Sequence, residues 1–121
     1  MDNKATLVIG ASTKSDRYSY QAIMRLRSYG HPVIAFGQSE GQVDDVSIET
    51  DWNPGWEVDT VTLYINPARQ EDYYERILEL KPNRVIFNPG TENAAFVSLL
   101  KEAGIETEYA CTLVMLSIGN Y

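Results

Sequence analysis

The sequence predicts a three-layer α/β domain with a mostly parallel sheet and a strand order near 3-2-1-4-5. Three observations favour this class. Short apolar runs alternate along the chain with segments of helical periodicity. A length of 121 residues suits one domain spanning residues 1–121 and leaves no room for a second of ordinary size. The composition, 44% hydrophobic and 22% charged, is that of a globular protein and excludes a disordered or collagen-like chain.

The first three elements form a βαβ unit. Residues 5–9 (ATLVI) suit a central parallel strand, because a strand covered on both faces is apolar throughout. Apolar residues at helical spacing predict a helix over residues 19–29, and Gly30 is a natural residue just past its end. Residues 32–36 (PVIAF) return as a second strand, and the crossover is expected to be right-handed.

The middle of the chain, residues 37–59, is expected to be a loop-rich crossing. Acids, glycine and a proline turn interrupt it, and residues 46–48 are its candidate for a short strand. Trp52 and Trp56 are expected to pack against the core. One of them is also a candidate for a contact with a ligand or with a second copy in a homodimer.

Regular alternation resumes in the second half of the chain. Strands are predicted over residues 61–65, 84–87 and 105–109, and helices over residues 70–80, 94–103 and 112–118. Pro82 and Gly104 are the stop signals of the first two of these helices.

The segments that follow the strands are the candidate ligand site. In open parallel sheets, ligands bind beyond the carboxyl ends of the strands, where the strand order reverses. These segments are rich in small and polar residues, which allow close approach of the backbone and leave N–H groups free for a phosphate. The first of them, residues 10–19, also carries Lys14 and Arg17, which are expected to meet an anion.

Charge is unevenly distributed along the chain. The net charge of −7 argues against sequence-independent binding to DNA or RNA. Residues 1–39 nevertheless hold five basic and two acidic residues, whereas the remainder holds five basic and fifteen acidic ones. The anion-binding potential therefore lies near the first loop, and Arg25 and Arg27 are expected on a solvated helix face.

A dinucleotide-binding oxidoreductase is the first alternative, and the sequence disfavours it. The pattern G-x-G-x-x-G fails at Ser12, and no acid stands near Phe36 to bind an NAD ribose. An NAD(P)- or other nucleotide-binding protein stays open because relatives of this fold vary. A second alternative is a regulatory interaction protein with a vestigial pocket and the tryptophan-rich crossing as its partner surface.

Catalytic groups are scarce. His31, the single histidine, stands at the amino end of the second strand, away from the candidate site, and is expected to be a surface turn residue. A Ser-His-Asp or Cys-His unit would require it, so neither is expected. The single cysteine, Cys111, excludes an internal disulfide and Cys-rich zinc sites.

Targeting signals are absent from the sequence pattern. The first residues lack the basic region of a signal peptide, and no apolar run approaches the ~20 residues that cross a bilayer. We therefore expect a cytoplasmic protein with no membrane partner.

Several short motifs, taken in order, resemble the small coenzyme A (CoA)-binding proteins. They are Val8-Ile-Gly-Ala-Ser12 with a following Arg-Tyr-Ser turn, Val33-Ile-Ala-Phe36, Val58-Asp59, Asn88-Pro-Gly90, Lys101-Glu-Ala-Gly104 and Cys111. Together they cover nearly the whole chain. The chain is similar to the CoA-binding domain of the succinyl-CoA synthetase alpha subunit, standing alone.

The resemblance implies a Rossmann-like fold that binds CoA or an acyl-CoA without a catalytic residue of its own. By position, it implies three groups around the ligand. They are Gly10, Ala11 and Ser12 at the pyrophosphate with Lys14, Arg17 and Tyr18 nearby; Phe36 and Gly37 beside the adenosine, with Ile65, Asn66 and Pro67 on the opposite wall; and Asn88, Pro89 and Gly90 along the pantetheine. Cys111 is expected to be a buried packing residue, with a place near the CoA sulfur as the alternative.

Overall fold

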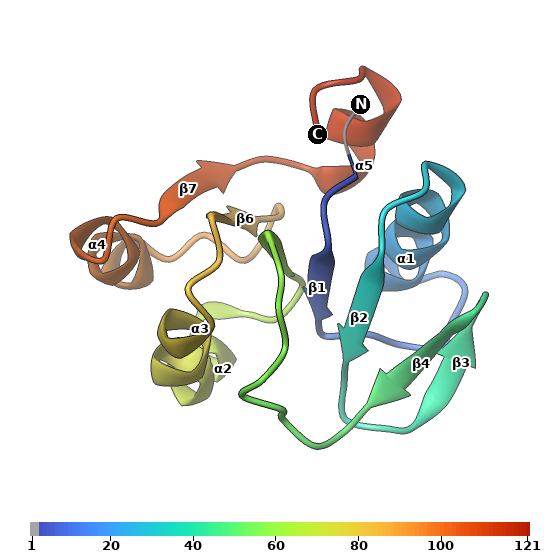
Figure 1. Cartoon of the computed structure of the whole chain (residues 1–121), viewed down its shortest axis with the longest axis horizontal. Helices are drawn as coiled ribbons and strands as arrows, with labels where there is room; N and C mark the ends of the chain where they lie inside the picture. Colours follow the sequence, from blue (N-terminus) through green and yellow to red (C-terminus); the bar gives the residue numbers. More distant parts are fainter. Residues whose placement is uncertain (1–2) are drawn as a thin grey trace.

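The computed structural model describes residues 3–121, which form one sheet of order β3-β4-β2-β1-β5-β6-β7 (Figure 1). The strands are β1 (Thr6–Ile9), β2 (Val33–Phe36), β3 (Gly41–Val43), β4 (Val46–Glu49), β5 (Thr60–Leu63), β6 (Arg84–Phe87) and β7 (Glu106–Tyr109). All neighbouring strands are parallel except the β3–β4 hairpin. The predicted α/β class is confirmed, and the order β4-β2-β1-β5-β6 is similar to the predicted one.

Helices cover both faces of the sheet, which gives the three layers. They are α1 (Tyr18–Ser28), α2 (Pro67–Gln70), the 3-10 turn η1 (Glu71–Tyr73), α3 (Tyr74–Leu80), α4 (Ala94–Glu102) and α5 (Thr112–Ser117). Figure 1 shows α2, α3 and α4 together, apart from α1. Alternate residues of β1 point to opposite faces: Leu7 and Ile9 pack in the cluster of α3 and α4, and Val8 packs in that of α1 and α5.

Two predicted elements differ from the structure. The crossing holds a β3–β4 hairpin where only one strand was expected, and Asp44 turns it with a φ of 55°. The hairpin forms because Val43, Val46 and Ile48 bury one face of it. The predicted helix over residues 70–80 is instead α2, η1 and α3, which begin earlier, at Pro67. The other bounds agree with the prediction or differ from it by one or two residues.

His31 was expected on the surface, and the structure shows that this was wrong. Its side chain is fully buried, its Nδ1 accepts a hydrogen bond from the Lys4 N–H at 2.9 Å, and its ring packs against Tyr121 with centroids 5.0 Å apart. Burial lowers the pKa of His31, and the neighbouring cations Lys4 and Arg84 lower it further. His31 is therefore a neutral core residue at the amino end of the sheet.

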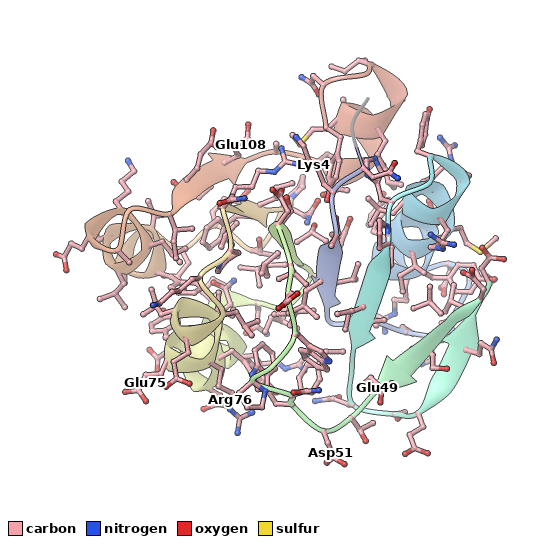
Figure 2. All side chains as sticks on the ribbon, viewed as in Figure 1. Lys4, Glu49, Asp51, Glu75, Arg76 and Glu108 are labelled. Atoms are coloured by element: carbon pink, nitrogen blue, oxygen red, sulfur yellow. The ribbon has the colours of Figure 1, made fainter. Side chains whose placement is uncertain are left out.

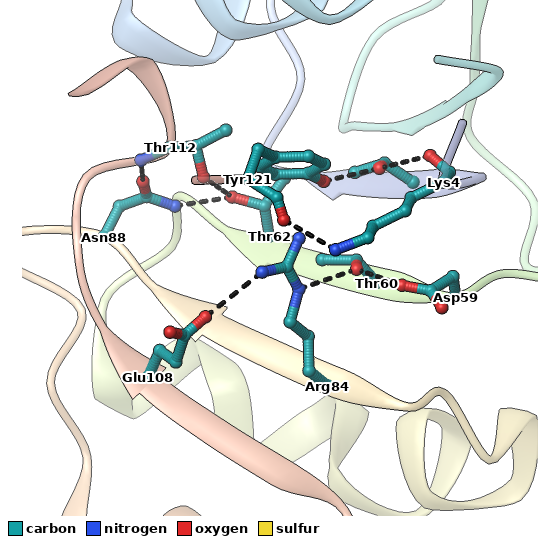
Figure 3. A network of polar contacts seen from close by, with 10 residues as sticks. Lys4, Asp59, Thr60, Thr62, Arg84, Asn88, Glu108, Thr112 and Tyr121 are labelled. Atoms are coloured by element: carbon teal, nitrogen blue, oxygen red, sulfur yellow. Dashed lines mark hydrogen bonds and ion pairs between the residues drawn. The ribbon is translucent and has the colours of Figure 1, made fainter. Parts of the chain in front are cut away.

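Arg84 lies in the same polar network (Figure 3). Its guanidinium donates to the Thr60 hydroxyl at 2.9 Å and to Glu108 at 3.2 Å, and it lies 4.4 Å from the centroid of the Tyr121 ring. This network ties the amino ends of β5 and β6, together with Glu108 of β7, to Tyr121, at the edge of the sheet opposite the expected site. In the described part of the chain, no helix is both long enough and apolar enough to span a bilayer.

Candidate ligand-binding site

A cavity of about 470 Å³ opens at the carboxyl edge of the sheet. Its walls come from the loop after β1, the first turn of α1 and the segments that follow β2, β5 and β6. They are Gly10, Ala11, Ser12, Thr13, Lys14, Arg17, Tyr18, Ser19, Gln38, Ser39, Tyr64, Arg69, Pro89 and Thr91. The position is the one at which open parallel sheets bind their ligands.

The loop Gly10–Ser12 is held between β2 and β5. The N–H groups of Gly10 and Ala11 both donate to the Phe36 carbonyl, at 2.9 and 3.0 Å. Gly10 has a φ of +95°, and a Cβ there would lie 3.1 Å from the Tyr64 carbonyl oxygen. A Cβ on Gly37 would lie 2.5 Å from the Ala11 carbonyl oxygen. Glycine is required at both positions, and the loop geometry depends on it.

The first turn of α1 faces the cavity with free backbone donors. The first intrahelical bond runs from the Gln21 N–H to the Arg17 carbonyl, so the three preceding N–H groups have no intrahelical acceptor. Arg17 is the N-cap and makes no side-chain cap, and the first turn holds no acid. This helix end therefore favours an anion, because free N–H groups and the helix dipole act together.

The side chains at the cavity are strongly biased in charge. Lys14, Arg17 and Arg69 line it, whereas no Asp or Glu among residues 3–121 does, in a protein of net charge −7. Among residues 3–121, ion pairs join Arg27 to Asp45 and Arg84 to Glu108, and none involves the three cavity cations. Figure 2 shows the side chains of Glu49, Asp51 and Glu75 at the surface of the molecule, and none of these three acids lines the cavity. The cavity is therefore a local positive site on an acidic protein.

A second, smaller cavity of about 200 Å³ adjoins the first. It is lined by Tyr18, Tyr64, Asn88, Pro89, Cys111 and Leu113. Tyr18, Tyr64 and Pro89 line both cavities, so the two share a wall. Cys111 is half-buried there, as the residue just before α5.

Asn88, which lines the second cavity, is fixed by hydrogen bonds to neighbouring elements (Figure 3). Its Nδ2 donates to the Thr62 hydroxyl at 2.6 Å and to the Leu63 carbonyl at 2.9 Å, and its Oδ1 accepts from the Thr112 N–H at 2.9 Å. These bonds join β5, β6 and the start of α5. Burial raises the pKa of Tyr64, and the neighbouring Thr62 and Thr112 hydroxyls oppose that shift. Tyr64 therefore stays protonated.

Comparisons with known proteins agree with this geometry. A family model described as a CoA binding domain matches residues 4–117. The chain belongs to the CoA-binding domain family. No curated protein gives a match.

Solved structures are similar to this CoA-binding domain over most of their length. The crystal structure of an uncharacterized protein is 49% identical, with all of each chain covered and a TM-score of 0.97. A Thermus thermophilus protein, cell-free ID.343, is 22% identical over 98% of this chain and 91% of its own, with a TM-score of 0.85. A hypothetical protein from Pyrococcus horikoshii OT3 is 19% identical over 93% and 81%, with a TM-score of 0.84. The last two show a shared fold.

The structure brings part of the predicted site together. The cavity walls of this CoA-binding domain include Gly10, Ala11, Ser12, Lys14, Arg17, Tyr18, Asn88 and Pro89. Phe36, Gly37, Ile65, Asn66, Pro67 and Gly90 do not line either cavity. Phe36 packs against Trp52, Trp56 and Tyr73 instead. Ile65 is a core residue, and Asn66 caps α2 by accepting from the Arg69 N–H at 3.0 Å.

Sequence reasoning did not assign several wall residues. They are Thr13, Ser19, Gln38, Ser39, Tyr64, Arg69, Thr91 and Leu113. Arg69 had a readable signal, because Asn66-Pro67 is a helix start and places residue 69 in the first turn. Among the residues that the structure describes, no three His, Cys, Asp or Glu side chains converge as metal ligands.

Proposed function

We propose that this protein binds CoA or an acyl-CoA through the loop Gly10–Ser12. The observation that carries the proposal is the unpaired positive charge of Lys14, Arg17 and Arg69 in a cavity without acids. CoA carries a pyrophosphate and a 3′-phosphate, so an anionic ligand of this class matches the site. Membership of the CoA-binding domain family supports the same ligand.

The roles of the residues follow from their position. The free N–H groups of α1 bind the pyrophosphate, because backbone donors at a helix start suit a phosphate, and the loop Gly10–Ser12 lets the ligand approach the backbone closely. The three cations provide charge-assisted hydrogen bonds to the remaining phosphate oxygens. The pantetheine then runs over Pro89 toward the second cavity.

The protein acts as a binding module rather than an enzyme. His31, the single histidine, is buried at the amino end of the sheet and shares no wall with the cavity. The wall side chains with a net charge are all cations, so no carboxylate or imidazole stands ready as a general base at the ligand.

Calorimetry with a panel of nucleotides tests the proposal. CoA and acetyl-CoA are expected to bind, and NAD, NADP and ATP to bind at least ten-fold more weakly. A ligand at a hundred times its Kd adds about 2.7 kcal/mol to the free energy of unfolding, so thermal shift gives a second readout. Selective binding of NAD(P) would favour the oxidoreductase-like alternative, and binding of none would favour the regulatory one.

Charge-removing variants test the cations. Arg17→Ala, Lys14→Ala and Arg69→Ala are each expected to weaken CoA binding about ten-fold, since a hydrogen bond to a charged group is worth about 1.5–3 kcal/mol. Arg25→Ala is the matched control, because Arg25 lies on α1 outside the cavity walls. Dephospho-CoA separates the two phosphate sites: an equal loss for both ligands assigns the residue to the pyrophosphate. A variant that binds as well as Arg25→Ala removes its residue from the site.

A further inference from the structure

We infer that the second cavity holds the acyl group of a short, uncharged acyl-CoA of about four carbons. The inference rests on the proposed CoA binding and adds the class of acyl group. Four properties of the second cavity support it: the wall that it shares with the first cavity, its apolar lining, its lack of charged wall residues and its volume.

The connection places the cavity at the far end of the ligand. Tyr18, Tyr64 and Pro89 separate and border both cavities, and the positive charge lies entirely in the first. A ligand that is anchored there by its phosphates therefore extends its thioester end past these three residues into the second cavity.

The walls of the second cavity offer an acyl chain few polar partners. Asn88 uses both its amide N–H donors and its oxygen on the protein itself, so it presents no free group. The Tyr64 hydroxyl has no hydrogen-bond partner among the described residues, but its oxygen is buried and is therefore not exposed to the cavity. Pro89, Leu113 and Cys111 complete a wall that suits hydrocarbon.

Charge discriminates between acyl groups. Lys14, Arg17 and Arg69 line the first cavity only, and none of the charged residues that the structure describes lines the second. A terminal carboxylate there would lose its hydration without gaining a cation. Butyryl-CoA is therefore favoured over succinyl-CoA, which has the same number of acyl carbons.

Size sets the chain length. A volume of about 200 Å³ accommodates roughly six or seven non-hydrogen atoms at ~30 Å³ for each water-sized group. A butyryl thioester needs six: the sulfur, the carbonyl carbon and oxygen, and three further carbons. Longer chains would extend into solvent.

Calorimetry with CoA, acetyl-CoA, butyryl-CoA, succinyl-CoA and octanoyl-CoA tests the inference. Each buried methylene is expected to lower Kd about four-fold. Butyryl-CoA, with two more methylenes, should therefore bind about 15-fold tighter than acetyl-CoA and at least ten-fold tighter than succinyl-CoA, and octanoyl-CoA no tighter than butyryl-CoA. Equal affinities, or a preference for succinyl-CoA, overturn the inference.

Leu113→Trp fills the second cavity, and Val114→Trp on the same helix is the control because Val114 is exposed and outside the walls. Leu113→Trp should bring butyryl-CoA to within two-fold of CoA, whereas Val114→Trp should keep the preference. If Leu113→Trp does not fold, Leu113→Ala should weaken butyryl-CoA binding several-fold by removing a contact. A butyryl preference that both Leu113 variants retain overturns the inference.

Adenosine 3′-phosphate 5′-diphosphate, which lacks the pantetheine, distinguishes a wrong acyl assignment from a failure of the proposed CoA binding. It should bind wild type and Leu113→Trp equally. If it and CoA bind without any acyl preference, only the acyl assignment is wrong. If neither binds, both proposals are wrong.

Discussion

Replacing Gly37 by alanine tests whether the end of β2 shapes the phosphate loop. The added Cβ would lie 2.5 Å from the Ala11 carbonyl oxygen, 3.1 Å from Ile48 Cγ2 and 3.3 Å from the Ala11 carbonyl carbon. The first of these is roughly 1 Å inside the ~3.5 Å of a comfortable contact. Because the nearest obstructing atom belongs to the backbone, no rotamer change relieves that clash, and the loop Gly10–Ser12 must move away from β2.

The cost can be bounded. Overpacking of this kind costs about 1–3 kcal/mol, and the reduced freedom of the unfolded chain returns about 0.4–1 kcal/mol. We expect Gly37→Ala to lower the free energy of unfolding by about 1–2 kcal/mol and Tm by roughly 4 °C for each kcal/mol. Displacement of the loop by ~1 Å should also weaken CoA binding about ten-fold or more.

Denaturant unfolding and calorimetry on the same samples provide the assay. Gly41→Ala is the control for stability: its Cβ would meet the methyl group of Thr13, a side chain that can turn away. Its free energy of unfolding should change by less than about 0.5 kcal/mol. Wild-type stability and wild-type CoA affinity in Gly37→Ala would refute the argument that this close approach sets the loop.

Three further outcomes are expected. Because burial lowers the pKa of His31, the imidazole of the unfolded state takes up a proton before that of the folded state as pH falls below ~6.5. The free energy of unfolding should therefore fall below that pH, by up to about 1.4 kcal/mol per pH unit. Urea unfolding between pH 7.5 and 5 measures this loss, which should be smaller for His31→Gln. Asn88→Ala removes three buried hydrogen bonds and should lower the free energy of unfolding by about 2–4 kcal/mol in the same assay; a loss below 1 kcal/mol would contradict its structural role. Iodoacetamide should alkylate Cys111 more slowly when butyryl-CoA is bound, as followed by intact mass, and an unchanged rate would argue against occupancy of the second cavity.

The parallel core was readable from the sequence because its strands are buried on both faces. Residues 84–87 are apolar but for Arg84, and the predicted strand has the bounds of β6. β4 was readable as a short strand over residues 46–48. β3 was not, since its three residues include a glycine and an exposed glutamine, and its turn into β4 depends on Asp44 in a left-handed conformation. Local patterns therefore identified the strands that carry the core and missed β3, the short strand at one edge of the sheet.

The residues of the candidate site likewise include some that the sequence indicated and some that it did not. Lys14 and Arg17 were identified because they follow a strand directly, whereas Arg69 was missed because the helix start was expected at residue 70. His31 was misplaced for a different reason: Tyr121, which covers it, lies at the other end of the described chain. A contact over that separation leaves no periodic signal in the sequence.

The aromatic cluster around Phe36 gives this protein an optical reporter. Both tryptophans contact that ring, Trp52 at 5.3 Å and Trp56 at 6.1 Å between centroids, and the sequence contains no others. The carbonyl of the same residue accepts the hydrogen bonds of Gly10 and Ala11. A ligand that displaces the loop also displaces Phe36 and so changes the surroundings of both indole rings. Tryptophan emission in a stopped-flow instrument can therefore follow ligand association without an added dye or a new substitution.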